Sequence, residues 1–158
     1  MTSGLYAGSF DPITLGHVDV IRRASRIFDR VIVTISINTS KHALFSIEER
    51  TRFAKEALQA FKNVTVVSSH ELTVNFAEQM GADVLIRGVR GSSDIDSELA
   101  IAGLNEQLDA KIQTIFIPTA ANYRDFSSSM IKEIAKFHGD VSNFVPEQVA
   151  IALQSKFQ

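Results

Sequence analysis

Short apolar stretches alternate along the chain with segments whose apolar residues recur at helical spacing. The stretches predict strands over residues 3–8, 30–37, 64–68, 84–87 and 112–117. All but the first are rich in β-branched residues, and their nearly continuous hydrophobicity is typical of a parallel sheet covered on both faces. From Thr14 onward the spacing predicts a helix with an apolar face formed by Val18, Ile21, Ala24, Ile27 and Phe28.

Helix start and stop signals separate the remaining strands. Ser46 to Glu49 is a capping box that begins a helix reaching about Phe61, and Gly81 is a natural stop for a helix over 73–80. Further helices are expected over 93–108, 128–137 and from Pro146, the last with apolar positions at Val149, Ile151, Leu153 and Phe157. Alternating strands and helices predict right-handed βαβ units. The expected fold is therefore α/β, a single Rossmann-like doubly wound domain over 1–158 with a five-stranded parallel sheet and a C-terminal helical extension.

Composition limits the possible partners. No apolar run approaches the ~18 residues that span a membrane, and the N-terminus shows no signal-peptide pattern. The 158 residues include no cysteine, which is compatible with a reducing cytoplasm. A net charge of −2 argues against nucleic-acid binding, so any anion site must be built from local cations. Candidates at strand ends and loops are Lys41, Arg87, Arg90 and Lys132.

Polar residues collect where the predicted strands end. The loops after the five strands carry, in order, Ser9 and His17; Lys41; Glu71 and Thr73; residues 87–91; and residues 123–129. In doubly wound sheets ligands bind beyond the carboxyl ends of the strands, where the strand order reverses. The sequence therefore predicts one polar site at that edge.

The first loop, Gly8 to His17, has the features of a phosphate site. Unpaired N–H groups at a helix start attract anions, and the imidazole of His17 adds a donor. Neither of the common glycine-rich phosphate motifs occurs in the chain. A plainer interpretation stays open, in which the glycines and Pro12 only form a turn and His17 is a solvated helix residue.

Several motifs together resemble one enzyme family. Gly8-Ser-Phe-Asp-Pro-Ile-Thr-Leu-Gly-His17 is similar to the T/S-x-G-H signature of a nucleotidyltransferase superfamily, and Phe126-Ser-Ser-Ser-Met-Ile-Lys132 to its second signature. Ser40-Lys41, Phe45-Ser-Ile-Glu-Glu-Arg50, Asn75-Phe-Ala77 and Leu85-Ile-Arg-Gly-Val-Arg90 narrow the resemblance to the bacterial phosphopantetheine adenylyltransferase family, over essentially the whole chain. The chain departs from that pattern with Ala7 for Pro, Ser9 for Thr, Thr73 for Met and Ser97 for an aromatic residue.

The resemblance implies transfer of AMP from ATP to 4′-phosphopantetheine, giving dephospho-CoA and pyrophosphate. It implies catalytic roles for Ser9, His17, Lys41 and Arg90, and acceptor binding by Ser9, Lys41, Leu72, Thr73, Arg87 and Asn105. The ATP site would comprise Ser9, Phe10, His17, Gly88, Val89, Arg90, Glu98, Tyr123, Arg124, Asp125, Phe126, Ser127, Ser128 and Ser129. Mg²⁺ would travel with the ATP phosphates, with no metal site formed by the protein itself. The family also implies a homohexamer. A cytoplasmic location, without binding to nucleic acid or membrane, is expected from the composition described above.

Alternatives stay open at this stage. Arg87 and Arg90 could pair with Asp94 and Glu98, Lys41 could be an ordinary loop lysine, and Ser127 to Ser129 could be only a helix cap. Asp11 reads as a turn residue rather than a metal ligand. Two rival functions remain: a related nucleotidyltransferase with another acceptor, such as nicotinate mononucleotide or glycerol phosphate, and a non-catalytic nucleotide-binding module.

Overall fold

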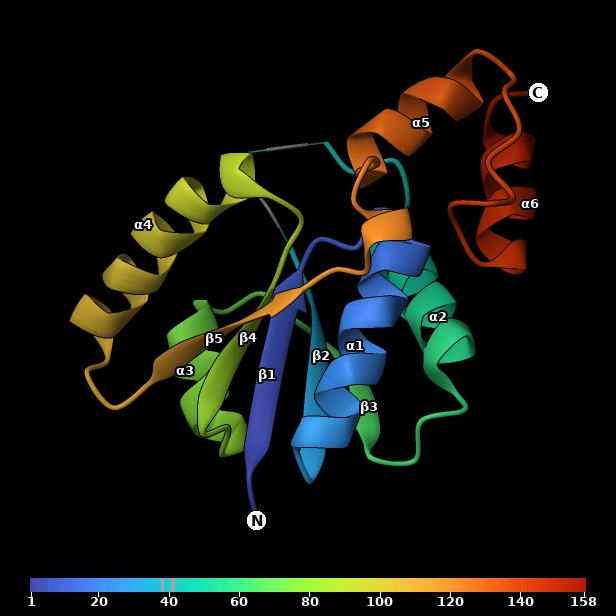
Figure 1. Cartoon of the computed structure of the whole chain (residues 1–158). Helices are drawn as coiled ribbons and strands as arrows, with labels where there is room; N and C mark the ends of the chain where they lie inside the picture. Colours follow the sequence, from blue (N-terminus) through green and yellow to red (C-terminus); the bar gives the residue numbers. More distant parts are fainter. Residues whose placement is uncertain (38, 41) are drawn as a thin grey trace.

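The computed structural model describes residues 1–37, 39–40 and 42–158. These residues form one five-stranded parallel sheet in the order β3-β2-β1-β4-β5 (Figure 1). The strands are β1 (Ser3–Gly8), β2 (Arg30–Ser36), β3 (Val64–Ser69), β4 (Val84–Val89) and β5 (Gln113–Pro118). The strand order reverses between β1 and β4, which lie side by side at the centre of the sheet.

Helices cover both faces of this sheet. They are α1 (Leu15–Ile27), α2 (Ile47–Leu58), α3 (Thr73–Met80), α4 (Ser92–Leu108), α5 (Ser128–Lys136) and α6 (Glu147–Lys156), with a 3₁₀ turn at Ala121–Tyr123. Helices α1 and α2 lie on one face and α3 on the other, as their separate core clusters show. The last two helices pack against each other beyond the α1 and α2 side (Figure 1). The doubly wound fold and the C-terminal helical extension are confirmed.

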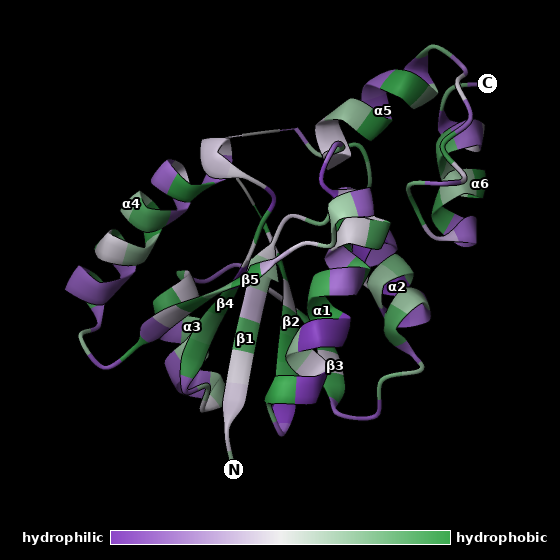
Figure 2. Ribbon diagram, in the orientation of Figure 1, coloured by the Kyte–Doolittle hydropathy of each residue, from purple (hydrophilic) through white to green (hydrophobic). Residues whose placement is uncertain are grey.

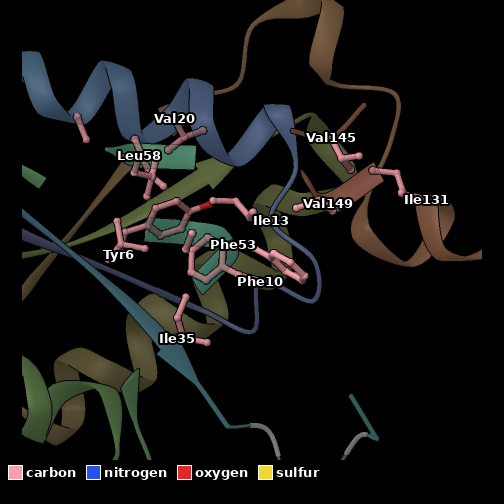
Figure 3. Close-up of a cluster of buried hydrophobic side chains, with 14 of the residues drawn as sticks. Tyr6, Phe10, Ile13, Val20, Ile35, Phe53, Leu58, Ile131, Val145 and Val149 are labelled. Atoms are coloured by element: carbon pink, nitrogen blue, oxygen red, sulfur yellow. The ribbon is translucent and has the colours of Figure 1, made fainter. Parts of the chain in front are cut away.

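The main core fills the space between the sheet and α1, α2, α5 and α6. Figure 3 shows Tyr6 and Ile35 from the sheet meeting Val20 of α1 and Phe53 of α2. Ile131 of α5 and Val149 of α6 belong to the same cluster and are fully buried. The C-terminal helices are therefore anchored by apolar packing, and α5 is held in place over the first loop.

Local signals set the helix boundaries much as the sequence predicts. Ser46 and Glu49 form the expected capping box, with backbone-to-side-chain bonds of 3.1 and 2.8 Å. Gly81 ends α3 in the left-handed conformation, at φ 66°, which glycine adopts without steric cost. Helix α2 ends at Leu58, earlier than the predicted Phe61. Strands β3, β4 and β5 end one or two residues later than predicted.

Two residues that the sequence analysis placed on apolar helix faces are exposed. Ile27 is 61% exposed because it is the last residue of α1, and Phe28 takes the buried position beside it. Ile151 is 54% exposed, whereas Val149 and Leu153 of the same helix are buried. Residues two apart on a helix point to nearly opposite sides, so Ile151 could not share their face.

Helix α4 differs from the others because none of its residues is buried. It carries exposed apolar side chains among its polar ones, and Figure 2 shows both kinds mixed along the helix. Within the part of the chain that the structure describes, no helix is both long and apolar enough to cross a membrane.

Candidate functional site

A cavity of about 400 Å³ opens at the carboxyl ends of β1 and β4. It lies where the strand order reverses, as the sequence predicts for a ligand site. Its floor comes close to α1: a Cβ added to Gly88 would lie 3.0 Å from Val20 Cγ2 and 3.3 Å from the Tyr6 hydroxyl. The remaining walls come from the loop after β1, the start of α1, the segment before α2, and the start of α5.

His17 projects into this cavity from the first turn of α1. Thr14 caps the helix, and the Thr14 N–H donates to Nδ1 of His17 at 3.0 Å. A backbone N–H can only donate, so Nδ1 must carry a lone pair and the proton of the neutral ring sits on Nε2. The cap thus uses one ring nitrogen and leaves Nε2–H on the opposite ring edge for a ligand in the cavity.

The surroundings keep the His17 ring neutral in the free protein. Burial, together with the positive charges of Arg90 and Arg87, lowers the pKa of His17 from 6.5 to about 4. The ring is also held edge-on against Phe10, with ring centroids 4.9 Å apart. His17 is therefore an oriented neutral donor at physiological pH, where the sequence alone suggested only a protonatable group.

This arrangement predicts the titration of His17. In NMR spectra of the free protein, the His17 Cε1 proton should titrate with a midpoint near 4, and Nε2 should be the protonated nitrogen above that pH. The folded pKa lies below the unfolded value, so the unfolded chain takes up the proton first. The stability contributed by neutral His17 should be complete above pH 6.5 and be lost as the pH falls through 4. The His17 signal is identified as the one missing from the spectrum of His17→Gln. A midpoint near 6.5 for that signal would contradict this account.

The loop between β1 and α1 is held by a buried carboxylate. Asp11 is 6% exposed, and its two oxygens accept the N–H groups of Leu44 and Phe45 at 2.8 and 3.0 Å. Lys132 of α5 pairs with the same carboxylate at 3.1 Å. Asp11 is thus more than the predicted turn residue, because it joins the first loop, the segment before α2, and α5.

Arg87 of β4 and Arg90, which directly follows that strand, line the cavity and also have acidic partners on α4. Arg87 makes a bidentate pair with Glu98, at 2.7 and 2.8 Å, and donates to the Ala7 carbonyl at 2.8 Å. The Glu98 carboxylate raises the pKa of Arg87 above its ordinary value. Arg90 pairs with Asp94 at 3.3 Å and donates to the Phe126 carbonyl at 3.1 Å. The ion pairs left open as an alternative therefore exist, and they hold the guanidinium groups at the cavity.

The serine motif begins α5 against the same cavity. Ser127 is the N-cap and accepts the Met130 N–H at 3.2 Å, which confirms the predicted capping role. The Ser128 hydroxyl donates to the Pro12 carbonyl at 2.8 Å, so α5 is tied to the first loop. The N–H groups of the first turn of a helix have no partner within the helix. Those of Ser128 and Ser129 are thus placed beside the cavity that these residues line.

Most predicted site residues meet at this cavity. Those that line it are Ser9, Phe10, His17, Arg87, Gly88, Arg90, Tyr123, Phe126, Ser127, Ser128 and Ser129. Leu72, Thr73, Val89, Glu98, Asn105, Arg124 and Asp125 do not line it. Lys41 lies outside the described residues. The acceptor residues proposed on α3 and α4 thus stand apart from the cavity, and Leu72 is 52% exposed.

Sequence reasoning gave no role to several residues of the cavity. Thr14, Thr119, Tyr6 and Arg50 line it without having been proposed for the site. Burial raises the pKa of the Tyr6 hydroxyl to about 12, so Tyr6 is a neutral wall. Arg50 belongs to the Phe45-to-Arg50 motif that carries part of the family resemblance, but the sequence analysis assigned it no role in the site.

Comparison with known proteins decides the family. The profile of the cytidylyltransferase-like family matches residues 5–134. A phosphopantetheine adenylyltransferase from Lachnoclostridium phytofermentans is 45% identical over 157 residues, which cover 99% of this chain and 96% of that protein. One of the same name from Methylococcus capsulatus is 48% identical over 155 residues, covering 98% and 96%.

The chain belongs to the phosphopantetheine adenylyltransferase family. Solved structures of more distant proteins share its fold. A Vibrio parahaemolyticus protein described as a nicotinate-nucleotide adenylyltransferase has a TM-score of 0.75 and 19% identity, covering 98% of this chain and 99% of its own. A lipopolysaccharide core biosynthesis protein from Thermoplasma volcanium has a TM-score of 0.57 and 18% identity, covering 75% and 98%. At such low identity these two similarities establish the architecture alone.

The donor set at the site is cationic and hydroxyl-rich. Among the described residues, no three His, Asp or Glu side chains gather closely enough to hold a metal ion. Asp11 lines the cavity, and its carboxylate is already paired with Lys132 and accepts two backbone N–H groups. For a phosphopantetheine adenylyltransferase, this is a donor set suited to phosphate oxygens.

Proposed function

We propose that this chain transfers AMP from ATP to the phosphate of 4′-phosphopantetheine, forming dephospho-CoA and releasing pyrophosphate. The near-full-length similarity to enzymes of that name carries the proposal. The cavity supports it, because Arg50, Arg87, Arg90 and Lys132 surround it together with His17 and the start of α5.

The reaction needs alignment and charge neutralisation more than proton transfer. An oxygen of the acceptor phosphate attacks the α-phosphorus of ATP. The bond between that phosphorus and the oxygen that links it to the β-phosphorus breaks. The acceptor phosphate is largely ionised at pH 7, with a second pKa near 6, so no general base is required. Pyrophosphate leaves with the bonding electron pair, and the developing negative charge must be met by donors already in place.

The predicted site residues that line the cavity have these proposed parts in the reaction. Nε2–H of His17 donates to an α-phosphate oxygen, while the Ser9 hydroxyl and the Phe10 N–H hold a further phosphate oxygen. Arg90 and the first-turn N–H groups of Ser128 and Ser129 hold the β- and γ-phosphates. Tyr123, Phe126 and Gly88, which line the cavity, would form the wall for the nucleoside. Contacts from Val89, Glu98, Arg124 and Asp125 are also part of the proposal.

The acceptor is proposed to lie on the other side of the first loop. Arg87 and Lys41 would hold its phosphate, and Leu72, Thr73 and Asn105 would contact the pantetheine arm. Leu72, at the start of α3, and Leu104 of α4 are 52% and 60% exposed, so both offer apolar surface to such an arm. Mg²⁺ would arrive bound to the ATP phosphates as part of the substrate, largely ligated by water.

A panel of substrates tests this function against its rivals. Pyrophosphate release should be measured with ATP and CTP, each against phosphopantetheine, nicotinate mononucleotide and glycerol phosphate. The proposal predicts turnover with ATP and phosphopantetheine and background rates for the other pairs. Turnover with another pair would support a related nucleotidyltransferase, and nucleotide binding without release would support a sensing module.

Assembly into a homohexamer is part of this proposal and rests on the family resemblance. The exposed apolar side chains of α4 and β5 support it, with Leu99, Leu108 and Ile115 exposed by 53, 60 and 37%. Exposed large apolar side chains are common at interfaces between chains. A cytoplasmic location stays a prediction.

Native mass spectrometry should give six times the 17.4 kDa chain mass. Leu99→Glu should shift the distribution toward smaller species, since it places a charge in the proposed interface, whereas Gln107→Glu on the same helix should not. A monomeric wild-type protein, or unchanged assembly in Leu99→Glu, would contradict the use of this surface.

A further inference from the structure

Arg50 is a buried cation with no acidic partner among the described residues. It lies in α2, is 5% exposed and lines the cavity. Among the described residues, its hydrogen bonds go only to backbone carbonyls: Nε donates to Phe45 at 3.1 Å, and Nη1 to Ser9 and Ser36 at 2.9 and 3.3 Å. No described carboxylate lies within ion-pair distance of it. Burying an uncompensated charge is costly, so its position needs an explanation beyond packing.

The other described cations of the cavity are each paired with an acid. Arg87 pairs with Glu98, Arg90 with Asp94, and Lys132 with Asp11. Each of these cations thus shares its charge with a carboxylate. Arg50 is the described arginine of the cavity that has no such carboxylate partner.

The bond from Arg50 to Ser9 also fixes the orientation of a peptide group. In a trans peptide the C=O and the following N–H point in opposite directions. Because Arg50 holds the Ser9 carbonyl, the Phe10 N–H points away from Arg50. No acceptor for that N–H occurs among the described residues. A carbonyl turned toward the ligand would instead repel phosphate oxygens.

The conformation of Phe10 indicates that this orientation is imposed. Phe10 has φ 46°, in the left-handed region that a bulky side chain rarely adopts. Its ring is packed edge-on between Tyr6 and His17, at 5.3 and 4.9 Å between centroids. Arg50 and this packing together hold a strained residue at the site, which is where such strain is commonly found.

Arg50 also holds the segment that follows β2. Arg50 donates a hydrogen bond to the Phe45 carbonyl, while the Asp11 carboxylate accepts the Phe45 N–H at 3.0 Å. The same segment is thus fixed from both sides, and Arg50 joins it to the ends of β1 and β2. A lysine at position 50 could supply charge, but its single ammonium lacks the planar fork that reaches three carbonyls.

We propose that Arg50 is a positioning residue for the phosphate site: it holds the Ser9 carbonyl so that the Phe10 N–H faces the bound phosphate, and its unpaired charge attracts that anion. The inference rests on the proposed function for the identity of the phosphate. Pyrophosphate binding tests it independently of the acceptor, because pyrophosphate is a simple anion that needs only this side of the cavity.

The test compares Arg50→Gln and Arg50→Lys with Arg52→Gln, which removes an exposed arginine from the same helix. Titration of the ¹⁵N-labelled protein with pyrophosphate should shift the Phe10 amide strongly in the wild type and in Arg52→Gln. In Arg50→Gln, affinity should fall about tenfold or more and the Phe10 shift should be lost, since a charged hydrogen-bond partner is removed. Arg50→Lys should recover affinity at low salt but keep a reduced kcat, because it restores charge and not the peptide orientation.

The outcomes separate this inference from the proposed function. A wild-type protein that makes no dephospho-CoA but shows the Phe10 response, lost in Arg50→Gln, would support the positioning role and contradict the acceptor. Wild-type pyrophosphate affinity, kcat and Phe10 response in a folded Arg50→Gln would overturn it. If Arg50→Gln does not fold, Arg50→Lys tests the positioning role instead. A wild-type kcat and a wild-type Phe10 response in Arg50→Lys would also overturn that role.

Discussion

His17→Gln is expected to lower kcat by about 10²–10³-fold, because a donor aimed at developing charge contributes that much to turnover. In the wild type, Nδ1 accepts the Thr14 N–H and Nε2–H is left for the α-phosphate. Glutamine at this position can still accept the Thr14 N–H, as in an ordinary capping box. The substitution therefore keeps the start of α1 and removes the donor. Single-turnover rates and ATP affinity should be measured on the same preparation, with affinity changed far less than the rate.

His17→Ala and a surface histidine complete this comparison. His17→Ala should lose the same turnover and, in addition, about 0.5–1.5 kcal/mol of stability, because the hydrogen bond from the Thr14 N–H to the side chain at position 17 is lost as well. His138→Asn is the control, since His138 is exposed and has φ 62°, which asparagine tolerates. If His17→Gln turned over within about a factor of two of the wild type, His17 would have no part in the chemical step.

Arg90→Ala should weaken binding of a non-hydrolysable ATP analogue by about 10- to 100-fold, as expected when a charged hydrogen-bond donor to phosphate is removed. Affinity for phosphopantetheine alone should stay nearly unchanged. The substitution also frees Asp94, whose carboxylate is 3.3 Å from Arg90 Nε in the wild type and would then repel phosphate. Isothermal titration with each ligand separately measures both effects.

Two further variants refine the assignment of Arg90. Arg90→Lys should recover only part of the affinity, because an ammonium group cannot make two parallel bonds to phosphate oxygens. Arg26→Ala is the control: it removes an exposed arginine from the last turn of α1, at the end of that helix away from His17. This variant should bind the ATP analogue like the wild type. Unchanged affinity of Arg90→Ala for the analogue, with unchanged turnover, would leave Arg90 as a partner of Asp94 and the Phe126 carbonyl only.

The sequence predicts the fold well because its signals are local and repeated. Capping at Ser46, the stop at Gly81 and the apolar strands are each encoded within a few residues and agree with one another. Ile27 and Ile151 were misplaced because helical spacing alone does not say where a helix ends or which side meets the core. The helix ends and the buried side of each helix depend on tertiary packing, which the sequence pattern does not specify.

The site is predictable in its parts but not in its electrostatics. The loops carrying Ser9, His17, Arg90 and Ser128 could be brought together by topology alone. That His17 is neutral required the Thr14 N–H and the nearby arginines in three dimensions. That Arg50 has no carboxylate partner among the described residues could be seen only in three dimensions, because acidic residues such as Glu48 and Glu49 stand beside it in the sequence.

The most direct test of the central claim follows the oxygens of the acceptor. Phosphopantetheine labelled with ¹⁸O in its phosphate should be incubated with the protein, ATP and Mg²⁺, and the products analysed by mass spectrometry. Direct attack on the α-phosphorus predicts dephospho-CoA that retains all of the label, formed together with an equal amount of unlabelled pyrophosphate. The absence of dephospho-CoA, or its replacement by free AMP as the adenylate product, would contradict adenylyl transfer to this acceptor.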